Sequence, residues 1–230
     1  MVANARKGTQ GAAVLFSAGL DSAVLLADAL RTERAVPVYV SSGLAWEAAE
    51  VDAIDRLLAH APFTDCAARL VHLHVDMRDV YPPAHWAIRG EAPASDTPDE
   101  DVYIEGRNII LLSKTAVFMA RAGLRRALIG TLAGNPFPDA TPVFLDAMAS
   151  ALTLGLDAPI EVLAPFARMH KSDVIRKGRD LGVPLELTLS CMQPVGGRHC
   201  GRCSKCRERR DAFREAGGAD PTAYARETAR

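Results

Sequence analysis

The sequence predicts an α/β protein: an open parallel sheet with helices on both faces, followed by a small C-terminal segment that binds zinc. Two observations lead to this prediction. Short apolar runs alternate with helical stretches over most of the chain, and such runs are typical of parallel strands buried on both faces of a sheet. Four of the five cysteines lie close together near the C-terminus. We therefore expect an α/β domain over residues 1–183 and a metal-binding segment over residues 184–230.

Composition limits the classes of protein that remain. The chain has 230 residues, of which 49% are hydrophobic, and 27 basic residues nearly balance 28 acidic ones. This length suits one domain with a small appendage, and the composition excludes a disordered or low-complexity chain. The near-neutral charge argues against direct nucleic-acid binding over a broad basic surface. No apolar run reaches the roughly 18 residues that span a bilayer, and the polar N-terminus lacks an apolar signal core. We expect a cytoplasmic protein without membrane contact.

The predicted elements follow one another in a regular order. The first apolar run, residues 12–16, ends at a turn of small residues and precedes a helical stretch over residues 21–31, which predicts a strand, a tight turn and a helix. Further strands are expected at residues 35–40, 69–75, 127–131 and 160–163. Further helices are expected at residues 45–60, 108–122, 144–154 and 172–181. Two loops interrupt the alternation, at residues 79–101 and 134–142. A loop as long as the first is usually functional or mobile.

The turn after the first strand is a candidate phosphate site, with the sequence Ser17-Ala18-Gly19-Leu20-Asp21-Ser22. Ligands bind at the carboxyl ends of strands in open parallel sheets, and a helix N-terminus offers free N–H groups and the positive end of its dipole. Gly19 allows close approach of the backbone, the serines add hydroxyl donors, and Asp21 either caps the helix or helps to hold Mg²⁺. A plain strand-to-helix turn with a polar cap is the alternative. The pattern is neither the dinucleotide-binding fingerprint nor the Walker P-loop.

Four cysteines form the second candidate site: Cys191, Cys200, Cys203 and Cys206. In a reducing compartment such a cluster indicates metal binding rather than disulfides. Four thiolates suit a tetrahedral, structural Zn²⁺ site, whereas an iron–sulfur cluster and four unrelated buried thiols are the alternatives. Cys66 stands alone and is expected in the core. The arginines around the cluster are expected to form a solvated face or to offset the charge of the zinc centre, with nucleic-acid contact as the alternative.

Residues 17–22 resemble the PP-loop of ATP pyrophosphatases, whose usual form is Ser-Gly-Gly-x-Asp-Ser. Ala18 replaces one glycine, and its methyl group is expected to crowd a left-handed backbone or a phosphate oxygen. A PP-loop followed by a C-terminal S-C-x8-C-G-x-C-x-x-C pattern resembles the 7-cyano-7-deazaguanine synthase family. Further stretches match this family in order: Glu105-Gly106-Arg107-Asn108, Lys171 with Asp173-Val174-Ile175, Ser190-Cys191, Arg209, Ala212-Phe213, and Asp220-Pro221-Thr222 with Tyr224.

This resemblance implies a PP-loop fold of the adenine nucleotide alpha hydrolase type and an ATP-dependent carbon–nitrogen ligase. Such an enzyme converts 7-carboxy-7-deazaguanine and ammonia to 7-cyano-7-deazaguanine, a precursor of queuosine, through adenylated intermediates. The resemblance also implies ATP, Mg²⁺ and Zn²⁺ as cofactors and a homodimer as the assembly. By their match to the family's motifs, Asp21, Arg107 and Lys171 are expected to be catalytic, residues 17–22 to bind ATP, and Arg107, Asn108 and Asp139 to bind the substrate. The loop at residues 79–101 is expected to close over the nucleotide as a lid.

Two stretches differ from the family. Residues 42–46 read Ser-Gly-Leu-Ala-Trp where the family has Tyr-Gly-Gln-Arg-His, and residues 134–141 keep only Phe137-Pro138-Asp139 of a longer polar stretch. Both loops are expected to border the substrate. Trp46 and Phe137 can stack a flat heterocycle, so we expect activity on the deazaguanine acid or a close analogue, with weaker discrimination. Two other functions stay open: a PP-loop enzyme that adenylates a different small molecule, protein or tRNA base, and a non-catalytic zinc protein that binds RNA.

Overall fold

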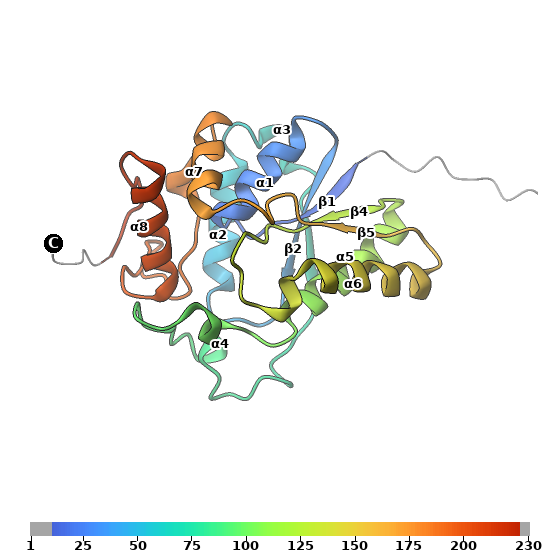
Figure 1. Ribbon diagram of the computed structural model, residues 1–230, viewed down its shortest axis with the longest axis horizontal. Helices are drawn as coiled ribbons and strands as arrows, with labels where there is room; N and C mark the ends of the chain where they lie inside the picture. The colour runs from blue at the N-terminus through green and yellow to red at the C-terminus, as the bar shows by residue number, and fades with distance from the viewer. Residues whose placement is uncertain (1–10, 226–230) are drawn as a thin grey trace, which may run out of the picture.

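A five-stranded parallel sheet lies at the centre of the computed structural model, which describes residues 11–225 (Figure 1). Its strands are β1 (Ala12–Leu15), β2 (Ala35–Ser41), β3 (Val71–His74), β4 (Arg126–Leu128) and β5 (Glu161–Leu163). Their spatial order is β3-β2-β1-β4-β5, and every neighbouring pair is parallel. The α/β class and the five strands expected from the sequence are confirmed.

Helices cover both faces of the sheet. In β1, Ala12 and Val14 belong to one apolar cluster, whereas Ala13 and Leu15 belong to another. The first cluster includes side chains of α1 (Leu20–Leu30), α2 (Glu47–Leu58), α3 (Thr64–Ala67), α7 (Lys171–Asp180) and α8 (Ser204–Ala216). The second includes side chains of α5 (Arg107–Ala122) and α6 (Pro142–Leu156). The central strands β1 and β2 are thus buried on both faces, as their apolar runs predict. The edge strands β3 and β5 are more exposed.

The strand order places the candidate phosphate turn at the site where a ligand is expected. β1 lies between β2 and β4, so successive connections turn in opposite directions on its two sides. In open parallel sheets, ligands bind at such a switch point, outside the carboxyl ends of the strands. β1 ends at Leu15, and residues 17–22 follow directly and open α1.

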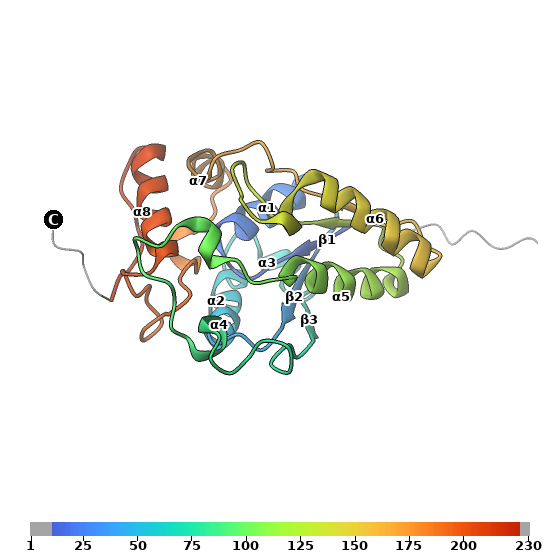
Figure 2. The same ribbon diagram turned by 60° about the horizontal axis from the view of Figure 1, so that its bottom comes forward.

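The segment at residues 79–101 is more structured than the sequence indicates. It contains α4 (Trp86–Arg89), and the 3-10 helix η1 (Asp99–Val102) begins at its end. Figure 2 shows the chain passing close to α8 before it reaches α5. There the Ser204 N–H donates a hydrogen bond to the Pro93 carbonyl at 3.0 Å. The segment is therefore tied to the C-terminal part of the protein, and its closure over a nucleotide stays a prediction.

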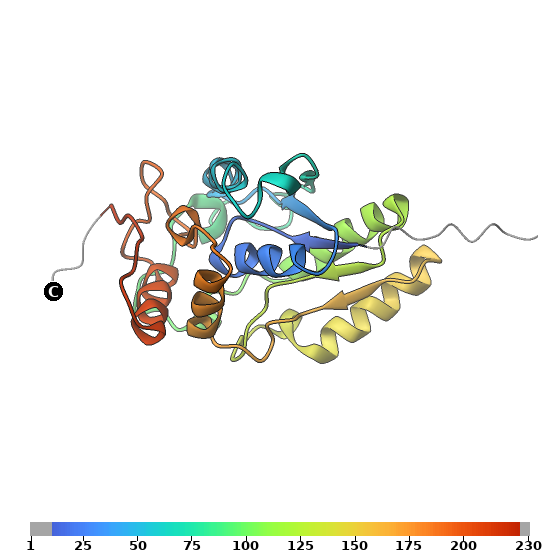
Figure 3. The same ribbon diagram turned by 90° about the horizontal axis from the view of Figure 1, so that it is seen from above.

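The C-terminal segment packs directly on the α/β domain. All four cysteines of the expected metal site belong to the same apolar cluster as α1 and α7, and Figure 3 shows α7 and α8 side by side at one end of the molecule. Cys66 is fully buried in this cluster, which confirms it as a core residue. The 3-10 helices η2 (Pro138–Ala140) and η3 (Leu185–Leu187) complete the elements. Within residues 11–225, no helix has the length and apolar character needed to cross a membrane.

Candidate functional site

A cavity of about 420 Å³ opens at the carboxyl ends of β1, β2 and β4. Its lining comes from the candidate phosphate turn, the start of α5, the loop after β4, and side chains of α7 and α8. Ala18 does not line it, whereas nine of the predicted catalytic, ATP and substrate residues do: Ser17, Gly19, Leu20, Asp21, Ser22, Arg107, Asn108, Asp139 and Lys171. The fold thus gathers the predicted ATP and substrate residues from distant parts of the chain into one cavity.

The phosphate turn is held in shape by its own side chains. Ser22 Oγ donates a hydrogen bond to the Gly19 carbonyl at 3.0 Å and accepts one from the Ser17 N–H at 3.3 Å. A Cβ on Gly19 would lie 3.3 Å from Ser17 Oγ, so the tight turn favours glycine there. Gly19 is the N-cap of α1 and makes no side-chain cap, which leaves the first N–H groups of the helix available to a ligand.

Ala18 adopts the backbone conformation that a glycine would adopt more easily. Its φ of 55° lies in the left-handed region, where alanine is strained by about 1–2 kcal/mol. Its methyl group is fully buried in the core cluster, and its carbonyl accepts a hydrogen bond from the Leu189 N–H at 2.8 Å. The left-handed backbone expected from the sequence is therefore present, and the methyl group packs into the core.

Asp21 and Lys171 belong to a cluster of charged side chains. Its other two members, Lys205 and Glu208 of α8, were not predicted from the sequence as site residues. Lys171 Nζ lies 3.2 Å from Asp21 Oδ2 and 2.6 Å from Glu208 Oε1. Lys205 Nζ lies 2.7 Å from the other oxygen of Glu208. All four residues line the cavity. Nothing in the local sequence around Glu208 distinguishes it from the other charged residues of this Arg-rich helix, so only the packing of α8 on α7 reveals its place.

The charges of this cluster shift one another's pKa values. Burial alone would raise the pKa of Glu208, but the ammonium groups of Lys171 and Lys205 outweigh it and lower that pKa to about 2. Burial raises the pKa of Asp21 although Lys171 opposes the shift. The buried Oδ1 of Asp21 has no hydrogen-bond partner. A carboxylate oxygen free in this way suits Mg²⁺, which prefers oxygen ligands.

Arg107 is a cation of the cavity that lacks an ionic partner. Within the described part of the chain it forms no ion pair, and its buried Nε has no hydrogen-bond partner. Burial raises the pKa of Glu50 and of Asp139, and the nearby charge of Arg107 partly offsets both shifts. A guanidinium that is free in this way suits a carboxylate or a phosphate, each of which it can bind with two parallel hydrogen bonds.

Asn108 and Asp139, both predicted to bind substrate, bind each other. The Asn108 N–H donates to Asp139 Oδ2 at 2.9 Å, and Asn108 Nδ2 donates to the Asp139 carbonyl at 3.0 Å and to Oδ1 at 3.2 Å. These contacts fix the loop after β4 against the start of α5. Both residues line the cavity, and their contact with a substrate stays a prediction.

Glu50 of α2 is another carboxyl that lines the cavity and that was not predicted from the sequence. Its Oε2 accepts a hydrogen bond from the Tyr39 hydroxyl at 2.9 Å, and its Oε1 accepts one from Trp46 Nε1 at 3.2 Å. Burial raises the pKa of Glu50 to about 7 against the opposing effects of Arg107 and these two donors. The spacing of four between Trp46 and Glu50 was the available signal, since residues at i and i+4 share one helix face.

Aromatic side chains complete the cavity wall beside Arg107 and Glu50. Trp46 stacks on Trp86 with ring centroids 5.7 Å apart and an interplanar angle of 11°. Tyr103 stacks on Phe137 with centroids 5.2 Å apart. The four rings all line the cavity. The sequence indicated Trp46 and Phe137, whereas Trp86 and Tyr103 come from the region that it left without regular structure.

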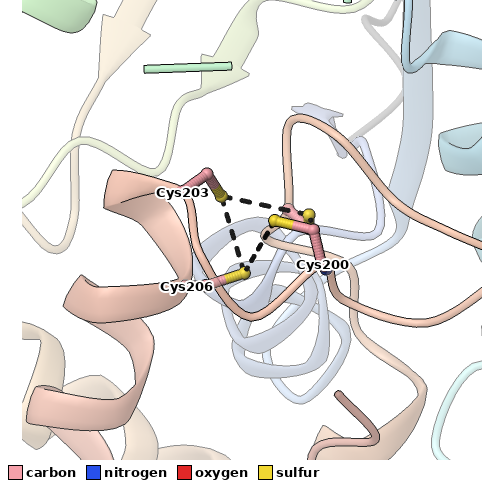
Figure 4. A group of neighbouring side chains, drawn as sticks. Cys200, Cys203 and Cys206 are labelled. Atoms are coloured by element: carbon pink, nitrogen blue, oxygen red, sulfur yellow. Dashed lines mark hydrogen bonds between the residues drawn. The ribbon is translucent and has the colours of Figure 1, made fainter. Parts of the chain in front are cut away.

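The four cysteines have the geometry of a closed metal site. The sulfurs of Cys191, Cys200, Cys203 and Cys206 all lie within 4.8 Å of one another, and three of their separations are 3.9, 3.9 and 3.5 Å (Figure 4). Tetrahedral zinc with bonds of about 2.3 Å places its sulfur ligands about 3.8 Å apart. Backbone N–H groups of Gln193 and Cys200 donate to Cys191 Sγ, which lowers the charge density of a thiolate. The residues present therefore fit Zn²⁺.

Several arginines near the cysteines make contacts within the protein. Arg209 is fully buried and donates hydrogen bonds to the hydroxyls of Thr188, Ser190 and Thr222 and to the Leu185 carbonyl. Arg207 pairs with Asp99 at 3.0 Å and so holds the 79–101 segment against α8. These contacts favour structural roles for the two side chains over nucleic-acid contact.

Comparison with known proteins identifies the family. A family model described as "Queuosine biosynthesis protein QueC" matches residues 11–217. The 7-cyano-7-deazaguanine synthase of Methanothrix thermoacetophila is 34% identical over 93% of this chain and 98% of that protein. The protein of the same name from an Anaeromyxobacter species is 32% identical over 96% of this chain and 98% of that protein, and the one from an Azoarcus species is 34% identical over 93% and 96%. Because the family model matches most of its length, the chain belongs to the family of the queuosine biosynthesis protein QueC.

Proposed function

We propose that this protein is an ATP-dependent carbon–nitrogen ligase that converts 7-carboxy-7-deazaguanine and ammonia to 7-cyano-7-deazaguanine. The observation that carries the proposal is the single cavity, in which a PP-loop-like turn, an arginine without an ionic partner and four aromatic rings lie together. The curated relatives named 7-cyano-7-deazaguanine synthase, matched over nearly their whole length, support the same reaction.

The reaction activates one carbon atom twice. The substrate carboxylate attacks the α-phosphate of ATP and pyrophosphate leaves, after which ammonia displaces AMP and yields the amide. The amide oxygen then attacks the α-phosphate of a second ATP, and loss of AMP and of the two amide protons leaves the nitrile. Such steps depend mainly on positioning and on neutralising charge in a site from which water is excluded.

The nucleotide half of the cavity supplies the groups for both adenylations. In this proposal the backbone N–H groups and hydroxyls of residues 17–22 bind the phosphates of ATP. Asp21 would hold Mg²⁺ through Oδ1, which has no hydrogen-bond partner, and the bound ion would supply positive charge beside the phosphates. Lys171 stabilises the leaving pyrophosphate, and its contacts with Asp21 and Glu208 hold it in place before the nucleotide binds.

The substrate half supplies an anchor for the reacting group. We assign Arg107 to the substrate carboxylate, because it is an unpaired guanidinium at the cavity wall. Asn108 and Asp139 fix the neighbouring loop and border the heterocycle. The stacked rings of Trp46 and Trp86 provide a flat apolar surface for it.

The proposed zinc has a structural role. Four cysteine ligands leave no open coordination position, which is typical of structural rather than catalytic zinc. Cys203 precedes α8 and Cys206 lies in its first turn, so the metal fixes the start of the helix that carries Lys205 and Glu208. Binding of zinc is thus expected to support the nucleotide half of the cavity, whose wall includes Cys191.

We infer a cytoplasmic homodimer that forms through the outer faces of α5 and α6. Val117 of α5 and Val143 and Leu154 of α6 are 48%, 80% and 84% exposed, and exposed apolar surface of this kind marks interaction sites. Four metal-binding thiolates fit a reducing compartment. Sedimentation should give a dimer for the wild type and a monomer for Leu154→Glu, whereas a wild-type monomer contradicts this assembly.

Product analysis tests the proposed reaction. Purified protein is incubated with ATP, Mg²⁺, ammonium and 7-carboxy-7-deazaguanine, and mass spectrometry is used to detect the amide and the nitrile. Appearance of both products supports the proposal. If neither forms while other carboxylates drive release of pyrophosphate, the protein is a PP-loop enzyme with a different substrate.

A further inference from the structure

The environment of Glu50 is unusual for a carboxyl group in this protein. It is 7% exposed and lines the cavity, yet within residues 11–225 it forms no ion pair, and its hydrogen-bond partners Tyr39 and Trp46 are neutral. The other acidic residues that line the wall are bound differently. Asp21 and Glu208 contact Lys171, and Asp99 pairs with Arg207. Both carboxylate oxygens of Asp139 accept hydrogen bonds from Asn108. Glu50 and Asp139 thus lack an ion pair, and of these two carboxyls Glu50 is the one bound by a tryptophan of the stacked pair. Its charge is left for a ligand on that wall to satisfy.

The hydrogen bonds of Glu50 leave room for two more. Tyr39 donates to Oε2 and Trp46 donates to Oε1, so each oxygen keeps a lone pair, because an ionised carboxylate accepts about four hydrogen bonds. The two existing donors also fix the orientation of the carboxyl plane. A carboxylate held in this way can accept from two adjacent N–H groups of one ligand.

The surroundings of Glu50 define the shape of that ligand. The stacked pair Trp46 and Trp86 offers a flat apolar wall. Arg107 lines the same cavity as Glu50, and its charge opposes the rise in the pKa of Glu50. A planar heterocycle that carries a carboxylate satisfies both features, since its ring stacks and its carboxylate pairs with the arginine. In such a ligand, an edge of the ring faces Glu50.

We propose that Glu50 is a specificity-determining residue that accepts two hydrogen bonds from the edge of a 2-aminopyrimidinone ring, one from the ring N–H and one from the exocyclic amine. This inference rests on the proposed function and assigns the group that reads the heterocycle. Tyr39 and Trp46 are positioning residues that hold the carboxylate. The stretch at residues 42–46, which differs from the family, thus contributes to recognition through Trp46.

A pH dependence follows from the same contacts. The pKa of Glu50 is raised to about 7, with burial as the main cause; Glu47 from the same helix adds to the rise, and Arg107 from α5 and the hydrogen bonds from Tyr39 and Trp46 oppose it. A ligand that donates two N–H groups binds the ionised form, so binding releases a proton near pH 7. Affinity should therefore increase as the pH rises through 7 and then level off.

Calorimetry with two ligands tests the proposal on the full-length protein, without ATP. The probes are 7-carboxy-7-deazaguanine and its analogue that lacks the exocyclic amine. The wild type should bind the first about 10- to 100-fold more tightly, because the analogue leaves a buried acceptor unpaired. Glu50→Gln should reduce this preference to within about threefold, since an amide offers a single acceptor. Asp52→Asn, an exposed change on the same helix, should keep the wild-type preference.

The possible outcomes separate this inference from the proposed function. Turnover of the acid by the wild type tests the reaction, whereas the preference between the two ligands tests Glu50. Equal affinity of the wild type for both ligands, or a full preference retained by Glu50→Gln, overturns the inference even when the nitrile forms. If Glu50→Gln fails to fold, the pH dependence of wild-type binding decides: affinity that does not change from pH 6 to pH 8 overturns the proposal.

Discussion

The two halves of the cavity are held by different kinds of contact. In the nucleotide half, charged side chains pair with one another: Lys171 contacts both Asp21 and Glu208, and Lys205 contacts Glu208. In the substrate half, Arg107 forms no ion pair within the described chain, and Glu50 is held by neutral donors. The first half is arranged before any ligand arrives, whereas the second keeps one cation and one carboxyl for a ligand.

Because of this difference, we expect substitutions in one half to change kcat and substitutions in the other to change the discrimination between acids. Charges that are fixed in advance stabilise a transition state without the cost of reorganisation, so changes in the nucleotide half should lower kcat for any acid that the protein accepts. Groups that lack partners gain their hydrogen bonds only from the correct ligand, and a site of that kind rejects analogues that lack the matching group. Changes in the substrate half should therefore act mainly on affinity and discrimination.

The largest effect is expected at Asp21. Asp21→Asn is nearly isosteric, so the fold should remain, but it removes the charge that pairs with Lys171 and that we propose holds Mg²⁺. Turnover should fall by at least about 10³-fold. Pyrophosphate exchange measures the loss, and circular dichroism melting controls for folding. A wild-type exchange rate in this variant would place the phosphate site elsewhere.

Removal of one zinc ligand should disturb the nucleotide half indirectly. Zinc should copurify at about one ion per chain, and Cys203→Ser should release it and destabilise the C-terminal segment, since metal binding and local folding are coupled. Because α8 carries Lys205 and Glu208, ATP turnover should decrease as well. Elemental analysis and thermal melting measure both effects. Iron with a visible absorption band would contradict the zinc assignment.

Glu208→Gln tests how α8 contributes to kcat without removing a zinc ligand. The change keeps the side-chain shape but removes the charge that holds Lys171 and Lys205. We expect kcat to fall by about 10- to 100-fold with little change in KM for the acid. Glu215→Gln, an exposed change on the same helix, is the matched control. An increase in KM for the acid without a change in kcat would contradict the separation of the two halves.

In the substrate half, Arg107→Lys keeps the positive charge and removes the planar fork. KM for the acid should increase about tenfold, because a lysine cannot pair with a carboxylate through two parallel hydrogen bonds. KM for ATP should stay the same. Steady-state kinetics with each substrate varied in turn provide the measurement. An equal increase in both values would mean that Arg107 binds the nucleotide.

The smallest effect is expected at Ala18. Ala18→Gly relieves the strain of a left-handed φ but removes a buried methyl group, and these contributions of about 1 kcal/mol each oppose one another. The free energy of unfolding should change by less than about 1 kcal/mol. ATP affinity should not change, because the methyl group lies in the core. A large gain in ATP affinity would show that the alanine obstructs the phosphate site.

Local signals allowed much of the fold and the metal site to be predicted. The central strands are short runs of apolar residues, which indicate buried strands. The turn at residues 17–22 lies between the first of these runs and a helix. The four cysteines are close in sequence, so their spacing alone indicates a shared metal. Lys171 was singled out by its motif, and the structure places it 3.2 Å from Asp21.

The missed residues depend on contacts between distant segments. Glu208 contacts Lys171 only because α8 packs on α7. Trp86 lies in a proline-rich segment that folds over its own small apolar cluster and against the cysteine segment. Glu50 of α2 accepts hydrogen bonds from Tyr39 of β2 and from Trp46. The spacing of Trp46 and Glu50 places them on one helix face but does not show that this face is buried.

The claim that one cavity performs both activations is tested most directly by stoichiometry. The wild-type protein is supplied with ATP, Mg²⁺, isotopically labelled ammonium and 7-carboxy-7-deazaguanine, and AMP, amide and nitrile are quantified over time. The account predicts two AMP for each nitrile, a transient labelled amide and the label retained in the nitrile. One AMP for each acid consumed with the amide as the final product, or AMP release with neither product, would contradict it.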